Sequence, residues 1–360
     1  MNAASLAARA PAGTPADLVA VKVTQAKDEH AWDQFVTQHP ESTCEHLWAW
    51  RTVITSVFGH KCIYLTAERS GAIVGVLPLV LFDSRLFGRS VVSLPFLNYG
   101  GVLASEPEAV ALLANEAERV GRDFGAAYVE LRHRAPLIPS LPRREHKLAL
   151  TRPLPASSDE LWAKVDRKVR NQVRKAQKDG LTVVSGGAEL VDQFYKVFAR
   201  NMRDLGTPVY PKSLFAEALR ALGDAARVHL VHMGPHATAG GVTVRHRDTV
   251  LVPWASSLRE FRTHCPNMLL YWNMLDESVR AGATVFDFGR SSPDSGPHHF
   301  KLQWGAQEAP MAWEYILINR STAPDHGPTS PHFAKLVSLW QKMPLAIANA
   351  VGPAIVRHIP

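Results

Sequence analysis

Residues 117–132, AERVGRDFGAAYVELR, are echoed by residues 276–290, DESVRAGATVFDFGR. With a two-residue gap the two stretches lie in register, and Arg132 falls near Arg290. Each stretch contains the end of a predicted helix and the short apolar strand that follows it. The glycine-bearing strands GAIVGV and ATAGGV, earlier in each half, correspond in the same way. The sequence therefore predicts a structural unit that occurs twice.

The predicted elements follow one order in both halves: a strand, two helices, three strands, a helix and a strand. In the first half they span 18–25, 31–38, 46–58, 61–68, 72–81, 90–97, 107–124 and 127–131, with a hairpin turn at 69–71. In the second half they span 181–184, 189–205, 212–222, 227–232, 239–245, 249–255, 267–281 and 284–288. We therefore predict an α/β protein with mixed sheets of the α+β kind. We also predict that it consists of two tandem domains related by internal duplication.

A chain of 360 residues with 46% hydrophobic content is long enough for two domains. The proline-bearing stretch 151–158 joins the two halves. We expect a flexible N-terminal tail at 1–17, a first domain at 18–150, a second domain at 151–322 and a C-terminal tail at 323–360.

The composition argues against several classes of protein. The cysteines number three, Cys44, Cys62 and Cys265, and lack a CxxC spacing, which disfavours a disulfide framework and a cysteine-rich zinc site. No run of about 18 apolar residues occurs, so a membrane-spanning helix is not expected. The N-terminal stretch has a single basic residue and no apolar run of signal-peptide length. We therefore expect a cytoplasmic protein.

Residues 161–179, LWAKVDRKVRNQVRKAQKD, concentrate positive charge in a chain whose net charge is +7. Apolar residues recur there at spacings of three and four, Ser157 and Glu160 form a predicted capping box, and Gly180 ends the pattern. We predict one helix of about 22 residues with a cationic face. That face is either an ordinary solvated surface or a contact for the phosphates of a nucleotide or RNA.

Residues 285–305, VFDFGRSSPDSGPHHFKLQWG, gather polar side chains just past a predicted strand end, where open sheets often place ligands. The aromatic residues Phe288, Phe300 and Trp304 in this company indicate the wall of a binding site. The Asp-Phe-Gly triplet lacks the other kinase motifs, so it does not indicate a kinase. The adjacent His298 and His299 lack a zinc-ligand spacing, so no metal is expected.

The order of elements resembles the GNAT acyltransferase fold, and two fused copies resemble the FemAB group of peptidyltransferases. The segments KVRNQVRKAQKDGL and FKLQWGA are similar to the opening and closing motifs of the second domain in that group. Residues 253–272, PWASSLREFRTHCPNMLLYW, and 286–296, FDFGRSSPDSG, resemble the FemAB-related branch associated with exosortase and PEP-CTERM systems. The resemblance covers roughly residues 19–320.

This resemblance implies that an amine attacks an activated acyl group. Such a reaction needs positioning, a proton acceptor and positive charge for the developing oxyanion. Lys301 matches the lysine of the closing motif and is the expected source of that charge, the alternative being a surface ion pair. Asp287 either orients the amine and accepts its proton, or is a buried and paired structural acid.

The remaining candidates are expected to contact substrate, and most have a structural alternative. Arg290 either clamps a carboxylate or phosphate, or pairs with Asp287 or Asp294. Phe300 and Trp254 either line the site or belong to the core. The full set is Arg290, Ser291, Ser292, Phe300, Trp304 and Trp254, with Arg167, Arg170, Arg174 and Lys175 of the basic segment.

The implied partners are an acyl donor, either aminoacyl-tRNA or acyl-CoA, and an amine-bearing precursor of peptidoglycan, another envelope component or an exopolysaccharide. No cofactor, metal or DNA partner is expected. CoA-binding GNAT enzymes resemble one another in a Q/R-x-x-G-x-G/A turn, and the corresponding segments SSLREFRTHCPNM and LNYGGVLASEPEA lack it. This difference counts against CoA and favours an aminoacyl or other donor, whose site the sequence does not identify. An acyl-CoA-dependent N-acyltransferase and a non-catalytic precursor-binding module are the alternatives.

The C-terminal segment predicts a short amphipathic helix, with Phe333, Leu336, Val337 and Trp340 on one face. This helix either packs against the second domain or lies at the surface of the inner membrane.

Overall fold

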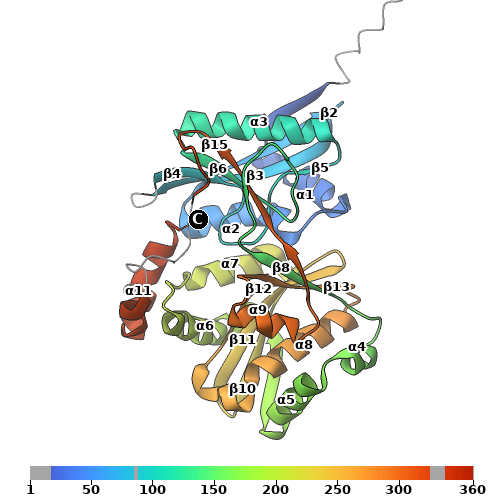
Figure 1. The fold of residues 1–360 in the computed structure, drawn as a ribbon, viewed down its shortest axis with the longest axis vertical. Coiled ribbons are helices and arrows are strands. Elements are labelled where there is room, and N and C mark those ends of the chain that lie inside the picture. The colour runs from blue at the N-terminus through green and yellow to red at the C-terminus, as the bar shows by residue number, and fades with distance from the viewer. Residues whose placement is uncertain (1–17, 85–87, 325–336, 360) are drawn as a thin grey trace, which may run out of the picture.

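The computed structural model describes residues 18–84, 88–324 and 337–359. Two mixed β-sheets, each covered by helices on both faces, lie one above the other in Figure 1. The expected N-terminal tail at 1–17 lies outside the described residues, as do Phe333 and Leu336 of the expected C-terminal helix.

The first sheet has the strand order β1-β2-β3-β4-β6-β15-β7, with β5 paired to β3. Its strands are β1 (Val19–Val23), β2 (Lys61–Arg69), β3 (Ala72–Ser84), β4 (Gly88–Val92), β5 (Leu103–Ala104), β6 (Tyr128–His133), β7 (Arg143–Arg144) and β15 (Ala312–Leu317). Helix α3 (Pro107–Phe124) covers one face, and α1 (Glu29–Gln38) and α2 (Ala49–Phe58) lie on the other (Figure 1).

The second sheet has the strand order β14-β8-β13-β12-β11-β10-β9. Its strands are β8 (Leu148–Pro153), β9 (Leu181–Gly186), β10 (Ala226–Met233), β11 (His236–His246), β12 (Thr249–Ser257), β13 (Val285–Ser291) and β14 (Gln307–Pro310). Its helices are α4 (Ser158–Lys164), α5 (Arg167–Lys178), α6 (Val191–Leu205), α7 (Lys212–Leu222), α8 (Pro266–Arg280) and α9 (Gly296–Leu302).

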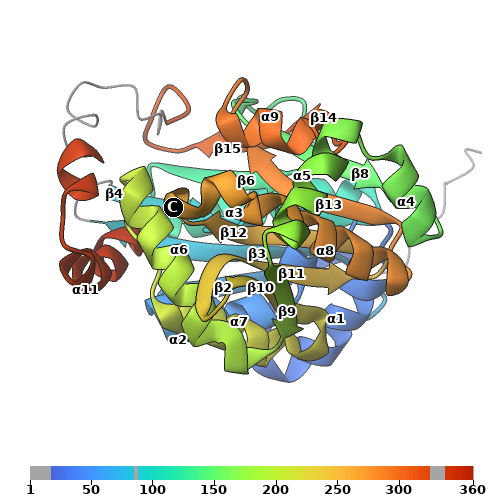
Figure 2. The ribbon, with the colours of Figure 1, turned by 90° about the horizontal axis from the view of Figure 1, so that it is seen from below.

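Side chains of the second sheet alternate between two hydrophobic clusters, as a pleated strand requires. Val228 and Leu230 of β10 pack in the cluster with α6 and α7, whereas Val231 packs in the cluster with α5 and α8. The two helix pairs therefore cover opposite faces of the sheet, and Figure 2 shows them on its two sides.

The two domains exchange strands. β8, which follows the first domain in the chain, pairs with β13 in the second sheet, and β15, which follows the second domain, pairs with β6 in the first. In Figure 1 the red-orange β15 reaches into the blue upper half of the molecule. The expected ranges 18–150 and 151–322 therefore do not coincide with the two sheets, because pairing between distant strands is not encoded in local periodicity.

The domains also share a hydrophobic core. Helix α2 packs against α7, and one continuous cluster joins Trp50 and Ile54 of α2 to Phe215 of α7 and Trp254 of β12. The ring centroids of Trp254 and Phe215 are 5.1 Å apart, and those of Trp254 and Trp50 are 6.3 Å apart. A core of this kind fixes the orientation of the two domains.

The predicted order of elements is confirmed in both halves, including the hairpin between β2 and β3. The single helix predicted for the basic segment is wrong. The structure has α4 and α5 instead. The first helix ends at Lys164, Val165 is extended, and Asp166 caps the second helix by accepting from the backbone N–H of Lys168 at 2.7 Å. The predicted cap at Ser157 is present, and accepts from the N–H of Glu160 at 3.2 Å.

Candidate functional site

The two parallel strands β12 and β13 separate along their length. They pair from Thr249 with Val285 to Leu251 with Asp287, but β12 continues to Ser257 and β13 to Ser291. Beyond the last pair the two strands diverge, so the backbone groups of β12 on this side have no strand partner. The gap is a place where an extended ligand can bind.

Gly289 shapes the gap from the side of β13. Its φ is 71°, and its N–H donates to the Asp287 carboxylate at 2.7 Å. A Cβ atom at this position would lie 3.2 Å from the carbonyl oxygen of Val252 on β12. Glycine is therefore required here for both its conformation and its close approach to the neighbouring strand.

Lys301 fills the gap from α9. The hydroxyl of Ser295 caps this helix by accepting from the N–H of His298 at 3.3 Å, and Pro297 lies in its first turn. The Nζ atom of Lys301 donates to the carbonyl oxygens of Gly289 at 3.1 Å and Arg290 at 2.9 Å. An ammonium has three donors, so one N–H remains for a ligand.

The Lys301 side chain is 7% exposed. Burial lowers the pKa of Lys301 to about 8, the Asp287 carboxylate opposes this shift, and the Arg290 guanidinium adds to it. Removal from water destabilises a charged amine, whereas the two carbonyls favour it. The amine therefore titrates just above neutral pH.

A cavity of about 320 Å³ opens beside Lys301. It is lined from both domains, by residues after β4 in the first and by α6, α8, α9, β12 and β13 in the second. Its aromatic walls are Phe96, Phe198, Tyr210, Trp254, Tyr271 and Phe288. Its polar groups are Asn98, Arg290 and Lys301. Apolar walls with a few convergent polar groups are typical of a small-molecule site.

The structure brings three of the residues expected from the sequence to this cavity, namely Lys301, Arg290 and Trp254. Trp254 also packs in the shared core, so it serves both roles that the sequence left open. Arg290 forms no ion pair with Asp287 or Asp294, and its guanidinium lies 5.0 Å from the ring centroid of Trp313.

Asp287 lies on the other side of β13, buried at the junction of the two domains. Its carboxylate accepts from the Tyr99 hydroxyl at 3.1 Å and from the N–H of Gly289, and it is 3% exposed. Together with Glu45 it lines a separate cavity of about 20 Å³. Burial raises the pKa of Asp287. Burial and the charge of Asp287 together raise the pKa of Glu45 to about 7.

The other candidates from the same segment lie behind the cavity wall. Trp304 is fully buried in the hydrophobic cluster around α8, and Phe300 packs against it and against Tyr271. Ser291 is buried, and Ser292 accepts a hydrogen bond from Lys147 at 2.5 Å. These residues support the wall and do not line the cavity.

The basic residues lie on α5, which does not line the cavity. Lys175 forms an ion pair with Asp179 at 2.6 Å, and the Arg174 guanidinium lies 5.4 Å from the ring centroid of Trp162. Arg167, Arg170, Arg174 and Lys175 therefore belong to a surface separate from the gap between β12 and β13.

Sequence reasoning missed the cavity walls contributed by distant segments, above all Phe96, Asn98, Tyr210 and Tyr271. Phe96 has a φ of 68°, which is unusual for a bulky residue. That strain is visible only in the structure. The sequence around Phe96, SLPFLNYGG, shows only a strand that breaks into a glycine-rich turn.

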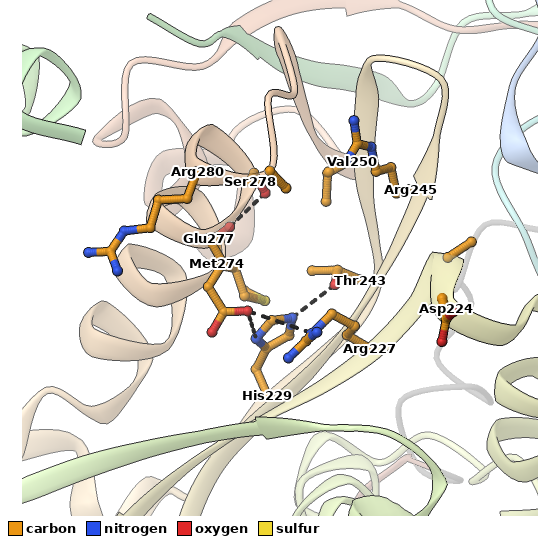
Figure 3. A pocket seen from close by; sticks show the side chains of 12 residues that line it. Asp224, Arg227, His229, Thr243, Arg245, Val250, Met274, Glu277, Ser278 and Arg280 are labelled. Carbon is orange, nitrogen blue, oxygen red and sulfur yellow. Dashed lines mark hydrogen bonds and ion pairs between the residues drawn. The ribbon is translucent and has the colours of Figure 1, made fainter. Parts of the chain in front are cut away.

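A second cavity, of about 440 Å³, lies between α8 and the strands β10 and β11 (Figure 3). On its floor the His229 ring contacts the Thr243 hydroxyl through Nε2 and the Ser185 hydroxyl through Nδ1, both at 2.9 Å. Ser185 in turn donates to Glu277 at 2.5 Å. Burial lowers the pKa of His229 to about 4, so the ring is neutral at pH 7. Each of these groups has a partner, and the chain of hydrogen bonds ties α8 to the sheet.

Among the described residues, no group of three or more His, Cys, Asp or Glu side chains is arranged to hold a metal ion. His298 is held by Glu308, with 2.6 Å between His298 Nε2 and the carboxylate. None of the helices within the described ranges combines the length and the apolar character needed to span a bilayer.

Comparison with known proteins bears on this arrangement. Residues 163–302 match the family described as "Acetyltransferase (GNAT) domain". No curated protein matches the chain. The structure is similar to that of FemX, with a TM-score of 0.64 and 16% identity over 83% of this chain and 98% of that one.

Two further solved structures have the same fold. The C-terminal domain of a putative lysylphosphatidylglycerol synthetase from Agrobacterium fabrum gives a TM-score of 0.56 at 14% identity, over 81% of this chain and 91% of that one. A tandem GNAT protein from the clavulanic acid biosynthesis pathway gives 0.52 at 14% identity, over 83% and 97%. The predicted tandem GNAT-like architecture is thereby confirmed. The family match also supports a transferase.

Proposed function

We propose that this chain is a FemAB-type acyltransferase that moves an acyl or aminoacyl group onto the amine of a cell-envelope or exopolysaccharide precursor. One observation carries the proposal: the Lys301 ammonium, anchored on two carbonyl oxygens, lies where β12 and β13 part, beside an aromatic cavity. The similarity to FemX in fold and the GNAT match support it. The motifs at 253–272 and 286–296 suggest a precursor of an exosortase-linked pathway.

The proposed reaction needs no protein nucleophile. The amine nitrogen attacks the acyl carbon and forms the new C–N bond, while the carbonyl oxygen takes up negative charge. The free N–H of Lys301 donates to that oxygen. Collapse of the intermediate breaks the bond to the donor, and the departing alcohol or thiol takes the proton that the amine has released.

The donor in this proposal is an aminoacyl-tRNA. The loop between β12 and α8 lacks the glycine-containing turn that resembles a pyrophosphate cradle, which counts against CoA. Arg167, Arg170, Arg174 and Lys175 on α5 would contact phosphates of a donor large enough to extend beyond the cavity. An acyl-CoA donor, or a non-catalytic module that binds precursors, is the alternative.

Titration calorimetry tests these three readings against one another. Acetyl-CoA, an aminoacyl-tRNA and UDP-linked sugars are titrated into the full chain at fixed salt. Binding of the aminoacyl-tRNA, together with transfer of its labelled aminoacyl group to an amine, supports the proposal. Tight binding of acetyl-CoA would contradict the aminoacyl donor, and binding of a sugar nucleotide without any transfer would favour the non-catalytic module.

The transfer rate should fall as the pH rises through about 8, because Lys301 loses the proton that it donates to the oxyanion near its lowered pKa. The acceptor amine must be neutral to attack, so the rate should also rise from low pH and give a bell-shaped profile. The measurement is kcat against pH for the unaltered chain and for Lys301→Arg, whose guanidinium stays charged. The falling limb should move to higher pH in the variant, and an unchanged limb would exclude Lys301 as its source.

The C-terminal helix α11 (Leu345–Val356) supports a proposed peripheral contact with the inner membrane. The helix contacts α6, its residues Ala348 and Gly352 are buried, and Gly352 lies against Val209 in the loop after α6. Ile347 and Val351 are 50% and 40% exposed. Figure 2 shows α11 beside α6 at the edge of the molecule. An exposed apolar pair on a short helix suits a shallow interfacial contact.

The chain should therefore sediment with vesicles that contain anionic lipid, since apolar contact at Ile347 and Val351 is the proposed attachment. Converting both residues to Ser should reduce the bound fraction several-fold. A matched exchange of Ala346 and Ala350, exposed on the same helix, to Ser should leave it unchanged. Equal binding of both double variants would exclude the helix as the attachment.

A further inference from the structure

Arg290 carries a charge that its surroundings do not balance. Within the described residues its guanidinium makes no ion pair and no hydrogen bond, and its Nη1 atom is sealed from solvent. Among the described residues, it makes a cation–π contact with the face of Trp313. Burial lowers the pKa of Arg290 to about 10, with the Arg132 cation adding to the shift, so it remains protonated at pH 7. Arg290 is partly buried. A partly buried cation without an ion-pair partner is costly unless something else supplies the counter-charge.

The described residues that line the cavity beside Arg290 include no acid. Its charged lining residues are Arg290 and Lys301, and the remaining lining residues are apolar, aromatic or neutral polar. The carboxylate that acts on the Arg290 charge, Glu130, is paired with Arg132 at 2.7 Å. Asp287, in the same strand as Arg290, accepts from Tyr99 and from the Gly289 N–H on the far side of β13. Two cations therefore face an aromatic cavity whose walls offer no negative charge.

In the first domain, an arginine near the corresponding place has partners for its charge. Arg132 on β6 pairs with Glu130 at 2.7 Å, and its Nη1 donates to the carbonyl oxygens of Leu94 at 3.2 Å and Leu97 at 2.9 Å. It is 2% exposed and fills the space where β4 and β6 part. Arg290, which lies near the corresponding place in the repeat, has none of these partners and lines the aromatic cavity.

We propose that Arg290 binds an oxyanion group, a carboxylate or a phosphate, on the substrate that enters this cavity, while the free N–H of Lys301 remains for the acyl oxygen. This inference rests on the proposed function, since it takes the cavity as the site of acyl transfer. It narrows the substrate class, because the small molecule bound between the aromatic walls is then an anion. Planar guanidinium groups bind both kinds of oxyanion through two parallel N–H groups.

Binding of three probes with one aromatic ring separates the possibilities. Phenylacetate carries a carboxylate, phenyl phosphate a phosphate, and phenylacetamide is a neutral isostere of the first. We expect at least one anion to bind the full chain about tenfold more tightly than the amide, measured by ligand-observed NMR titration at constant ionic strength. Preference for phenylacetate identifies a carboxylate substrate, and preference for phenyl phosphate identifies a phosphate substrate. Equal affinities for all three would overturn the inference.

The variant Arg290→Gln should lose the preference for the anion but still bind phenylacetamide, which shows that the cavity is intact. Arg280→Gln is the matched control, because Arg280 is exposed, pairs with Asp276 and lies at the second cavity. It should keep the preference. If Arg290→Gln does not fold, Arg290→Lys replaces it and should weaken the preference. An anion preference that survives in Arg290→Gln would contradict the assignment.

These measurements do not depend on acyl transfer. If the unaltered chain shows no transferase activity but its anion preference is lost in Arg290→Gln, the proposed function is wrong and the anion site is supported. If the unaltered chain is an active transferase without any anion preference, the anion site is wrong and the proposed function is supported.

Discussion

Replacing Lys301 with methionine is expected to reduce kcat for acyl transfer by about 100-fold or more, which is the loss typical of removing one donor to an oxyanion. Methionine keeps the length and apolar stem of the side chain, so α9 should still pack against β13. It removes the ammonium that bridges the carbonyl oxygens of Gly289 and Arg290 and extends one N–H into the gap. The measurement is single-turnover transfer of a labelled aminoacyl group.

The matched control is His299→Ala, two residues earlier on the same helix. His299 is exposed and does not line the cavity, so the rate should stay within about twofold of the unaltered chain, as expected of a surface substitution. A Lys301→Met chain that transfers at the normal rate would remove this lysine from the mechanism. Equal losses in both variants would show that the helix had been disturbed, and the assignment of Lys301 would then fail.

Replacing Arg132 with methionine is expected to lower the free energy of unfolding by about 3–5 kcal/mol, because it leaves one partner of a buried ion pair without its counter-charge. Glu130 is 1% exposed, so its carboxylate would lose its ion-pair partner in the interior of the first domain. The carbonyl oxygens of Leu94 and Leu97 would also lose their donor. The measurement is the urea midpoint followed by tryptophan fluorescence.

Arg119 provides the control for this second prediction. It forms ion pairs with Glu116 and Asp123 on the solvent face of α3, at 2.6 Å each. Surface pairs of this kind contribute little. The change Arg119→Met should leave the urea midpoint unaltered. An unaltered midpoint in Arg132→Met would mean that this arginine does not stabilise the space where β4 and β6 part.

The sequence predicted what depends on local periodicity. The order of helices and strands in both halves follows from spacings of two, three and four residues, and from caps such as Ser157. The basic segment shows the limit of that approach. Its apolar stripe continues past Asp166, but the carboxylate of that residue accepts from the N–H of Lys168 and caps a second helix. A local hydrogen bond thus overrides an uninterrupted hydrophobic pattern.

The site was predictable only in part, for a different reason. Lys301 and Arg290 belong to one short segment, so a motif can point to them. The opposite walls come from Phe96 and Tyr210, which are far from that segment in the chain and reach the cavity only because the two domains share a core. Asp287 and Trp304 lie in the same motif, yet alternation along β13 and packing of α9 turn them away from the cavity.

The exchange of β8 and β15 has a consequence for biosynthesis. While the chain grows on the ribosome, the first sheet is without β15, so the edge of β6 has no neighbour until residue 317 has emerged. The Glu314 carboxylate, which accepts from His133 and from the N–H groups of Leu137 and Ile138, arrives equally late. A nascent chain or a truncated product therefore exposes an unpaired strand edge, which chaperones and proteases can recognise. Cells should clear such fragments, so that a complete first domain is found only where the second is present.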